Sequence, residues 1–211
     1  WTAWASLPDS RTVNTSAAFR DAFITVNADA AHQHGKGSEH SHAGTAFTTW
    51  LDLKQAGQQA KAIRDALVKR LPDSQPILDE NFSALNKELS EVEAELSEVA
   101  EKFGQTPLVG SHPVYQYLAR GYDLNIISVH WEPSVMPDAA GWEALSNLRK
   151  KHPAKIMLWE EEPAKEIVEK LKELGVASVV FNPCGNRHRS LDWLAVMRTN
   201  ISRLGAVVPK K

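Results

Sequence analysis

Residues 78–103, LDENFSALNKELSEVEAELSEVAEKF, are the stretch that decides the fold. Apolar residues recur in it at alternating steps of four and three, while Glu and Lys fill half of the other positions. This spacing predicts one long amphipathic helix, because residues three and four apart share one face of an α-helix. At 1.5 Å per residue the helix would be roughly 40 Å long, which is enough to span two lobes. A coiled-coil dimer seam is the alternative. The apolar positions are Leu78, Phe82, Leu85, Leu89, Val92, Leu96, Val99 and Phe103.

A shorter amphipathic helix is predicted just before it. The stretch from Asp52 to Arg70 is rich in Ala, Gln, Lys and Leu, and Pro72 marks its end. Further upstream, we expect a short strand over residues 11–14 and a helix-like stretch over residues 17–23. The predicted apolar face of the shorter helix consists of Leu53, Ala56, Ala60, Ile63 and Leu67.

From Pro107 onward, short apolar runs alternate with helical segments. This alternation predicts a parallel sheet covered by helices on both faces. The expected strands are Leu108–Gly110, Ile126–Val129, Lys155–Trp159 and Ala177–Phe181. The expected helices are Val114–Tyr122, Ala139–Lys150, Lys165–Leu174 and Leu191–Leu204.

Open sheets of this kind bind ligands beyond the carboxyl ends of their strands. That rule gives the places where a site is expected, namely Ser111-His112, residues 130–133, residues 160–162 and residues 182–185.

Composition excludes several classes of protein. The 211 residues carry a formal net charge of −2 and show no basic stripe interleaved with aromatics, so nucleic-acid binding is not predicted. Cys184 is the one cysteine, which excludes an intramolecular disulfide and a zinc–thiolate cluster. No apolar run approaches the roughly 20 residues that cross a bilayer.

The segment His32-Gln-His34-Gly-Lys-Gly-Ser-Glu-His40-Ser-His42 places four imidazoles on a glycine-punctuated loop. Imidazole is the commonest protein ligand for zinc, so this loop, residues 32–42, indicates metal handling. A solvated linker or a purification-tag remnant is the alternative, although tags are normally terminal and homopolymeric.

Several motifs, in order, resemble the zinc and manganese substrate-binding proteins of bacterial ABC transporters. They are the His-rich loop, Trp50-Leu-Asp opening a helix, the long helix, Gly110-Ser-His112-Pro-Val-Tyr-Gln-Tyr-Leu-Ala-Arg-Gly-Tyr122, Trp131-Glu-Pro, Trp159-Glu160, Phe181-Asn-Pro-Cys-Gly185 and Trp193-Leu-Ala-Val-Met-Arg-Thr-Asn-Ile201. The resemblance implies an α/β fold of two lobes, with parallel sheets flanked by helices and joined by one long rigid helix. Applied to this chain, it gives a partial N-terminal lobe (1–74), a linking helix (75–104) and a C-terminal α/β lobe (105–211).

The resemblance also implies a metal site in the cleft between the lobes. His112 matches the first C-lobe ligand, although a His near a helix start can simply cap that helix. Thr48 stands where a ligand His is expected, so His42, or else His40, is the candidate to replace it. Asn182 stands where the last ligand is usually Asp.

An amide at that position gives the ion less charge, so water or Glu160 would complete the site. A Cys184 thiolate is an alternative ligand, although a lone Cys beside Pro and Gly is more often a buried small residue. The histidine-rich set favours Zn²⁺ over Mn²⁺, which prefers oxygen ligands.

The expected function is therefore a monomeric, periplasmic or otherwise extracytoplasmic binding protein that delivers metal to an ABC permease. Chains of the resembling family begin with a further N-terminal portion that carries the first His ligand, so upstream sequence, and with it a lipid anchor, is expected before Trp1. A zinc hydrolase is one alternative, yet the chain has no His-Glu-x-x-His or Gly-x-Ser-x-Gly motif. A coiled-coil interaction protein with incidental histidines is the other.

Overall fold

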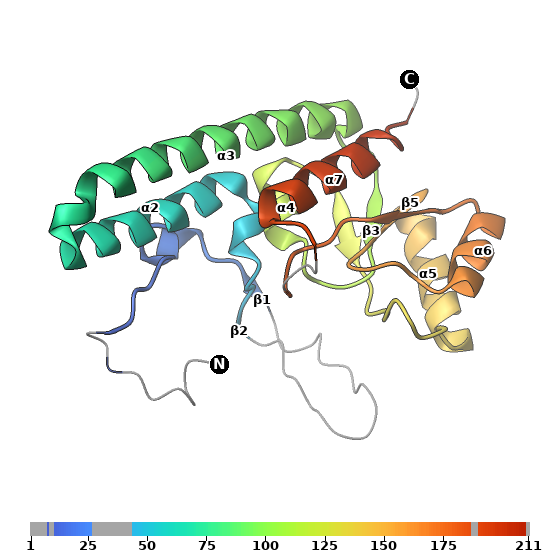
Figure 1. The fold of residues 1–211 in the computed structure, drawn as a ribbon. Coiled ribbons are helices and arrows are strands. Elements are labelled where there is room, and N and C mark those ends of the chain that lie inside the picture. Colours follow the sequence, from blue (N-terminus) through green and yellow to red (C-terminus); the bar gives the residue numbers. More distant parts are fainter. Residues whose placement is uncertain (1–7, 9–10, 27–43, 187–189, 210–211) are drawn as a thin grey trace.

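The computed structural model describes residues 8, 11–26, 44–186 and 190–209. A helical hairpin and a parallel α/β unit lie end to end, and the longest helix runs along both (Figure 1). The hairpin consists of α2 (Leu53–Arg70) and α3 (Gln75–Phe103), joined by the 3-10 turn η5 (Pro72–Ser74). Helix α2 begins where predicted because the Asp52 carboxylate accepts hydrogen bonds from the amides of Lys54 and Gln55.

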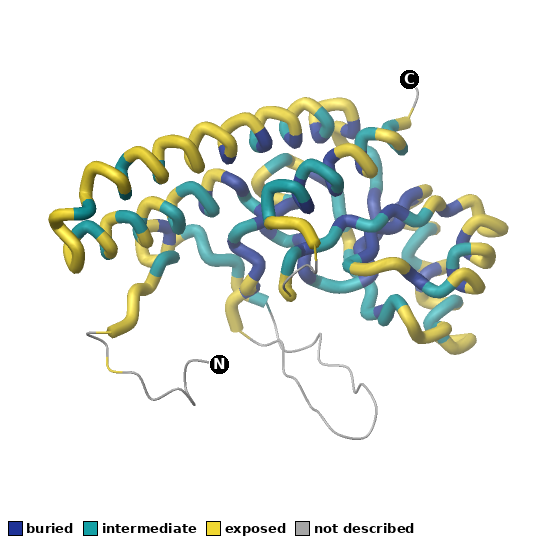
Figure 2. The backbone as a smooth tube through the Cα atoms, viewed as in Figure 1, coloured by how far each residue is buried: buried dark blue, intermediate teal, exposed yellow. Residues whose placement is uncertain are grey.

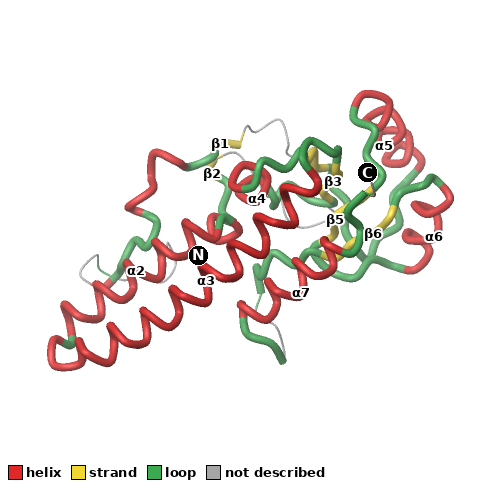
Figure 3. Tube along the Cα trace, turned by 90° about the horizontal axis from the view of Figure 1, so that it is seen from above, coloured by secondary structure: helices red, strands yellow, loops and turns green. Residues whose placement is uncertain are grey.

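Helix α3 is buried only along its second half. Its buried side chains begin at Leu89, whereas Leu85 is 38% exposed. Figure 2 shows the same change along the helix, and Figure 3, from above, shows α2 beside the first half and α7 (Trp193–Gly205) beside the second. The second half of the apolar stripe is thus covered by the same chain, which accounts for the pattern without a coiled-coil partner.

A four-stranded sheet forms the centre of the α/β unit. Its order is β4-β3-β5-β6 and every neighbouring pair is parallel, with Val109 of β3 opposite Ile127 of β4 and Met157 of β5. The strands are β3 (Leu108–Gly110), β4 (Ile126–Ser128), β5 (Ile156–Trp159) and β6 (Ala177–Val180). The helices between and after them are α4 (Gln116–Gly121), α5 (Ala139–Lys151), α6 (Lys165–Glu173) and α7.

Alternate strand residues pack on opposite sides of the sheet. Leu108 and Leu158 belong to the core cluster shared with α3 and α7, whereas Val109 and Met157 belong to the cluster shared with α5 and α6. Side chains alternate between the two faces of a strand, so both faces can be apolar and both are covered. The predicted α/β class, with a parallel sheet flanked by helices, is confirmed, and after Pro107 the predicted element ends lie within two residues of those observed.

The part before α2 departs from the sequence prediction. Residues 11–14 form no strand, and residues 17–23 form the 3-10 helix η2 (Ala17–Ala22) in place of an α-helix. Strands β1 (Thr25–Val26) and β2 (Gly44–Thr45) pair antiparallel, and the short 3-10 turn η4 (Thr49–Leu51) leads into α2. The parallel sheet expected for the N-terminal lobe is absent from the described residues, because such pairing needs a strand–crossover–strand unit that this stretch does not contain. The division at residues 74 and 104 remains a prediction.

No helix in the described ranges is both long enough and apolar enough to cross a membrane.

The packing of α3 gives a stability prediction. Leu96 is completely buried in the core shared by α3, α7 and the sheet. Leu96→Ala should therefore lower the free energy of unfolding by about 2–5 kcal/mol, through lost burial and the cavity left behind. Leu85→Ala, the same change on the exposed half, should cost less than about 1 kcal/mol. Urea unfolding at constant m-value measures both, and equal losses would contradict the burial described here.

Candidate metal centre

Three strand ends meet around His112. Strand β3 lies between β4 and β5, so the residues that follow it have the ends of both neighbours beside them. The Ser111 amide donates to the Leu158 carbonyl at 2.8 Å, and the Ser111 carbonyl accepts from the Trp131 amide at 2.8 Å. These main-chain bonds extend the sheet pairing by one residue and place His112 between the loops that carry Glu132 and Glu160.

Two carboxylates flank the His112 ring. Its Nδ1 lies 2.7 Å from Oε1 of Glu160, and its Nε2 lies 3.9 Å from Oε1 of Glu132. His130 packs against the same ring edge to face, with the ring centroids 5.8 Å apart. The His112 side chain is 15% exposed, so its neighbours shield the ring from most of the solvent.

This environment raises the His112 pKa above the ordinary imidazole value. The hydrogen bond to Glu160 is the main cause, and the negative charges of Glu160 and Glu132 add to it. Partial burial acts in the opposite direction because it disfavours the charged ring. The surroundings of His112 therefore favour the protonated form of the ring.

A tryptophan cluster supports the two acidic loops. Trp131, just before Glu132, packs against Trp159, just before Glu160, with ring centroids 6.3 Å apart. Trp142 of α5 packs edge to face on Trp131 at 4.8 Å. Because both tryptophans are buried in the core beside α5 and α6, the backbones that carry the carboxylates are held by packing.

Thr48 and Asn182 stand where the resemblance implied metal ligands, and the side chains of both residues form hydrogen bonds with backbone groups. Thr48 is buried, and its Oγ1 donates to the Val114 carbonyl at 2.6 Å. The Asn182 Oδ1 accepts from the Cys184 amide at 2.7 Å, so this oxygen already takes part in a turn. Burial raises the pKa of the Cys184 thiol to about 11, which keeps it protonated and a poor metal ligand near neutral pH.

The segment around Thr48 nevertheless lies against the loops of the predicted site. The bond from Thr48 reaches the turn that follows His112, and the Trp50 indole Nε1 donates to the Pro183 carbonyl at 2.6 Å. The turn before α2 is therefore tied to the loop after β3 and to the loop after β6. Three positions that the resemblance assigned to ligands lie on segments that contact one another.

The structure brings only some of the predicted site residues together. His112 and Glu160 are in contact, whereas Asn182 follows β6, two strands away from β3. Within the described ranges, no three His, Cys, Asp or Glu side chains are gathered closely enough to hold a metal ion. The loop histidines His32, His34, His40 and His42 lie outside the described residues.

Two neighbours of His112 received no ligand role from the sequence. Glu132 and His130 both follow β4, a strand end at which the sheet rule predicted a site, and Glu132 lies in the Trp131-Glu-Pro motif, yet the resemblance gave neither residue a ligand role. His152 is buried, with its Nε2 2.8 Å from the Leu108 carbonyl oxygen. Glu161 and Glu162, which follow Glu160, are exposed.

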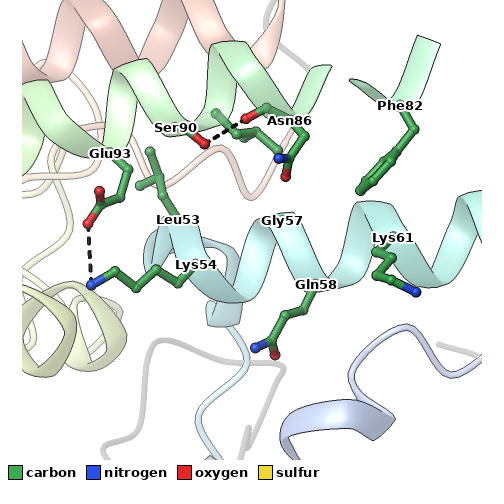
Figure 4. Close-up of a pocket in the computed structure, with 10 residues that line it drawn as sticks. Leu53, Lys54, Gly57, Gln58, Lys61, Phe82, Asn86, Ser90 and Glu93 are labelled. Carbon is green, nitrogen blue, oxygen red and sulfur yellow. Dashed lines mark hydrogen bonds and ion pairs between the residues drawn. The ribbon is translucent and has the colours of Figure 1, made fainter. Parts of the chain in front are cut away.

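A groove of about 340 Å³ lies between α2 and α3 (Figure 4). Leu53, Phe82 and Leu89 give it an apolar lining, and Lys54 and Glu93 form an ion pair at its edge with 3.5 Å between Nζ and Oε1. Glu93 is the one metal-ligating side chain among its lining residues, so this groove does not compete with the strand ends as a metal centre.

Comparison with known proteins supports the assignment of the fold and shows the family. The family model described as "Zinc-uptake complex component A periplasmic" matches residues 6–207. The zinc-binding protein AdcA of Streptococcus pyogenes is 30% identical over 186 residues, which cover 84% of this chain and 36% of that protein. The chain thus spans about a third of the length of that relative.

Solved structures give the same fold. The metal-dependent lipoprotein YcdH of Bacillus subtilis superimposes with a TM-score of 0.78 at 21% identity, covering 98% of this chain and 74% of that one. The Zn(II)-bound ZnuA-like domain of Streptococcus pneumoniae AdcA superimposes with a TM-score of 0.72 at 24% identity, covering 79% of this chain and 65% of that one. Taken with the family model, the chain belongs to the periplasmic zinc-uptake component A family.

The ion pair at His112 gives a pH prediction. A raised pKa means that the folded chain holds the imidazole proton more tightly than the unfolded chain does. The pair therefore stabilises the fold fully below pH 6.5, the ordinary imidazole value, and this contribution is lost as pH rises through the higher folded-state pKa. Glu160→Gln should lower the His112 pKa in an NMR titration, and should destabilise the fold more near pH ~5.5 than near pH ~9. Glu161→Gln is the matched control, and an unchanged His112 pKa in Glu160→Gln would contradict the pair.

Proposed function

We propose that this chain is a solute-binding protein that captures zinc outside the cytoplasm and delivers it to the permease of an ABC transporter. The observation that carries the proposal is the His112 imidazole, held between two carboxylates at the carboxyl end of a parallel sheet in a member of a zinc-uptake family. Negatively charged groups around an imidazole favour a divalent cation over a neutral solute.

The ligand set extends from His112 to residues on the N-terminal side. His42 is the first candidate for the role that Thr48 leaves vacant, with His40 as the second. Thr48 itself is engaged with the Val114 carbonyl, and a hydroxyl is a poor zinc ligand. Asn182 and Glu160 are the residues that the sequence offers to complete the coordination, although the Asn182 oxygen already accepts from the Cys184 amide and Glu160 contacts Nδ1 of His112.

Zinc is the preferred cargo and manganese the alternative. A histidine-centred site favours a borderline metal such as zinc, while manganese prefers mainly oxygen ligands. The names of the relatives point the same way, since the streptococcal AdcA is called a zinc-binding protein. A resident catalytic metal is not part of this proposal, because a binding protein releases its ion and does not turn over a substrate.

The partner is a membrane permease, and the protein acts as a monomer that does not bind nucleic acid. The location is periplasmic or otherwise extracytoplasmic, with attachment to the membrane by a lipid anchor. The family description names a periplasmic component, which supports the location. A formal charge of −2 supports the absence of nucleic-acid binding.

A zinc titration against a chromophoric chelator tests the site. His112→Ala should weaken zinc binding at least ~100-fold, equivalent to about 2.7 kcal/mol, because it removes the ligand on which the other groups converge. Glu162→Gln, an exposed acid nearby, is the control and should change affinity less than about twofold. Weak, multiple binding that survives His112→Ala would refute the cleft site and with it the transport function.

The histidine loop is proposed to collect metal and pass it to the site. Deleting residues 33–41 should then slow zinc acquisition, followed by stopped-flow mixing, more than it weakens equilibrium affinity. A variant with His32, His34, His40 and His42 all replaced by alanine keeps the loop length and separates ligation from length. A loss of affinity larger than the loss of rate would reject the collecting role and place a loop histidine among the equilibrium ligands.

A further inference from the structure

Two carboxylates touch His112 in different ways. Glu160 lies at hydrogen-bonding distance from Nδ1, 2.7 Å, and its side chain is 25% exposed. Glu132 lies 3.9 Å from Nε2, beyond hydrogen-bonding distance, and its side chain is 42% exposed. The two nitrogens are on opposite sides of the ring, so the two acids cannot play the same part toward one ion.

The contact with Glu160 sets the state of the ring. A neutral imidazole that donates its Nδ1 proton to a carboxylate carries its lone pair on Nε2. Histidines that bind metals commonly make such a bond to an outer carboxylate, which orients the ring and makes the other nitrogen more basic. A metal ion cannot occupy Nδ1 while that bond exists.

The distance between Nε2 of His112 and the Glu132 carboxylate is close to the distance between two ligands of one zinc ion. With Zn–N and Zn–O bonds of about 2.0–2.2 Å, two ligands of a tetrahedral zinc ion lie about 3.4 Å apart. Nε2 of His112 and Oε1 of Glu132 are 3.9 Å apart, so a shift of about half an ångström allows both to bind one ion. An exposed glutamate side chain makes such a shift easily, since only its own rotamer must change.

The backbone on either side of Glu132 is held in place. The Trp131 amide donates to the Ser111 carbonyl, and the Pro133 carbonyl accepts from the Ala164 amide, both at 2.8 Å. These bonds tie the Glu132 segment to the β3 end on one side and to the start of α6 on the other. The carboxylate is therefore presented beside His112 whether or not an ion is bound.

We propose that Glu132 is a direct metal ligand together with Nε2 of His112, while Glu160 is a positioning residue that orients His112 and does not bind the ion. The inference rests on the proposed zinc-binding function and assigns roles within that site. It also explains how the chain supplies negative charge to the ion although Asn182 has an amide whose oxygen accepts from the Cys184 amide.

Zinc affinities of matched variants test this division of roles. Glu132→Gln should weaken zinc binding at least ~100-fold, because a charged ligand is lost. Glu160→Gln should weaken it by about tenfold or less, since the amide oxygen still accepts the Nδ1 proton, and Glu160→Ala by about 10–100-fold. Glu161→Gln, an exposed acid next to Glu160, should have less than a twofold effect.

Nitrogen-15 NMR of the histidine rings supplies a readout that general destabilisation would not produce. In the metal-free protein at pH values above the His112 pKa, His112 should be the Nδ1–H tautomer in the wild type and in Glu160→Gln, and should lose that preference in Glu160→Ala. On adding Zn²⁺, the signal of Nε2 and not that of Nδ1 should show metal ligation. Circular dichroism confirms that each variant is folded.

Three results would decide against the inference. Zinc on Nδ1, or a Glu160→Gln loss as large as that of Glu132→Gln, would make Glu160 the ligand. An unchanged affinity in Glu132→Gln, with tight binding that His112→Ala abolishes, would overturn the role of Glu132 and leave the proposed function standing. Failure of the wild-type chain to bind zinc at all would overturn both.

Discussion

The pairing of β3 between β4 and β5 is the constraint on which the candidate site depends. Parallel strands end at the same edge of a sheet, so the central strand delivers its next residue between the loops of its two neighbours. His112 follows β3, Glu132 follows β4 and Glu160 follows β5, and main-chain bonds from Ser111 extend the pairing past the strand. The contact between one imidazole and two acids is thus a consequence of strand order.

The same sheet is stabilised by two different cores. On one face, alternate strand residues pack against α3 and α7, and on the other they pack against α5, α6 and the tryptophans that precede the acidic residues. A densely packed core leaves its side chains little room to move, so it also fixes the position of the loops attached to it. The tryptophan face therefore supports the site directly, while the face toward α3 connects the sheet to the helical hairpin.

The departures from the family pattern have a structural explanation. Thr48 and Asn182 satisfy buried backbone groups, which a ligand at the same place would leave without those bonds. Thr48 ties the turn before α2 to the turn after His112, Trp50 ties it to the loop after β6, and the Asn182 side chain holds a turn within that last loop. The negative charge of the site comes instead from Glu132 and Glu160. These residues follow β4 and β5, the two strands that flank β3.

By itself, the sequence determined the α/β class, the strands and helices after Pro107, the long helix, and His112 and Glu160 as candidate site residues. These features are local, because hydrophobic periodicity and the residues after a strand can be read along the chain. Strand order is not local, so only the tertiary structure placed Glu132 and His130 against His112. Tertiary packing likewise decided that α3 is buried from Leu89 onward and exposed at Leu85. The apolar stripe is continuous along the helix, so its sequence does not show which part other elements cover. It also decided that residues 11–14 form no strand, because a short segment becomes a stable strand only where a partner strand lies beside it.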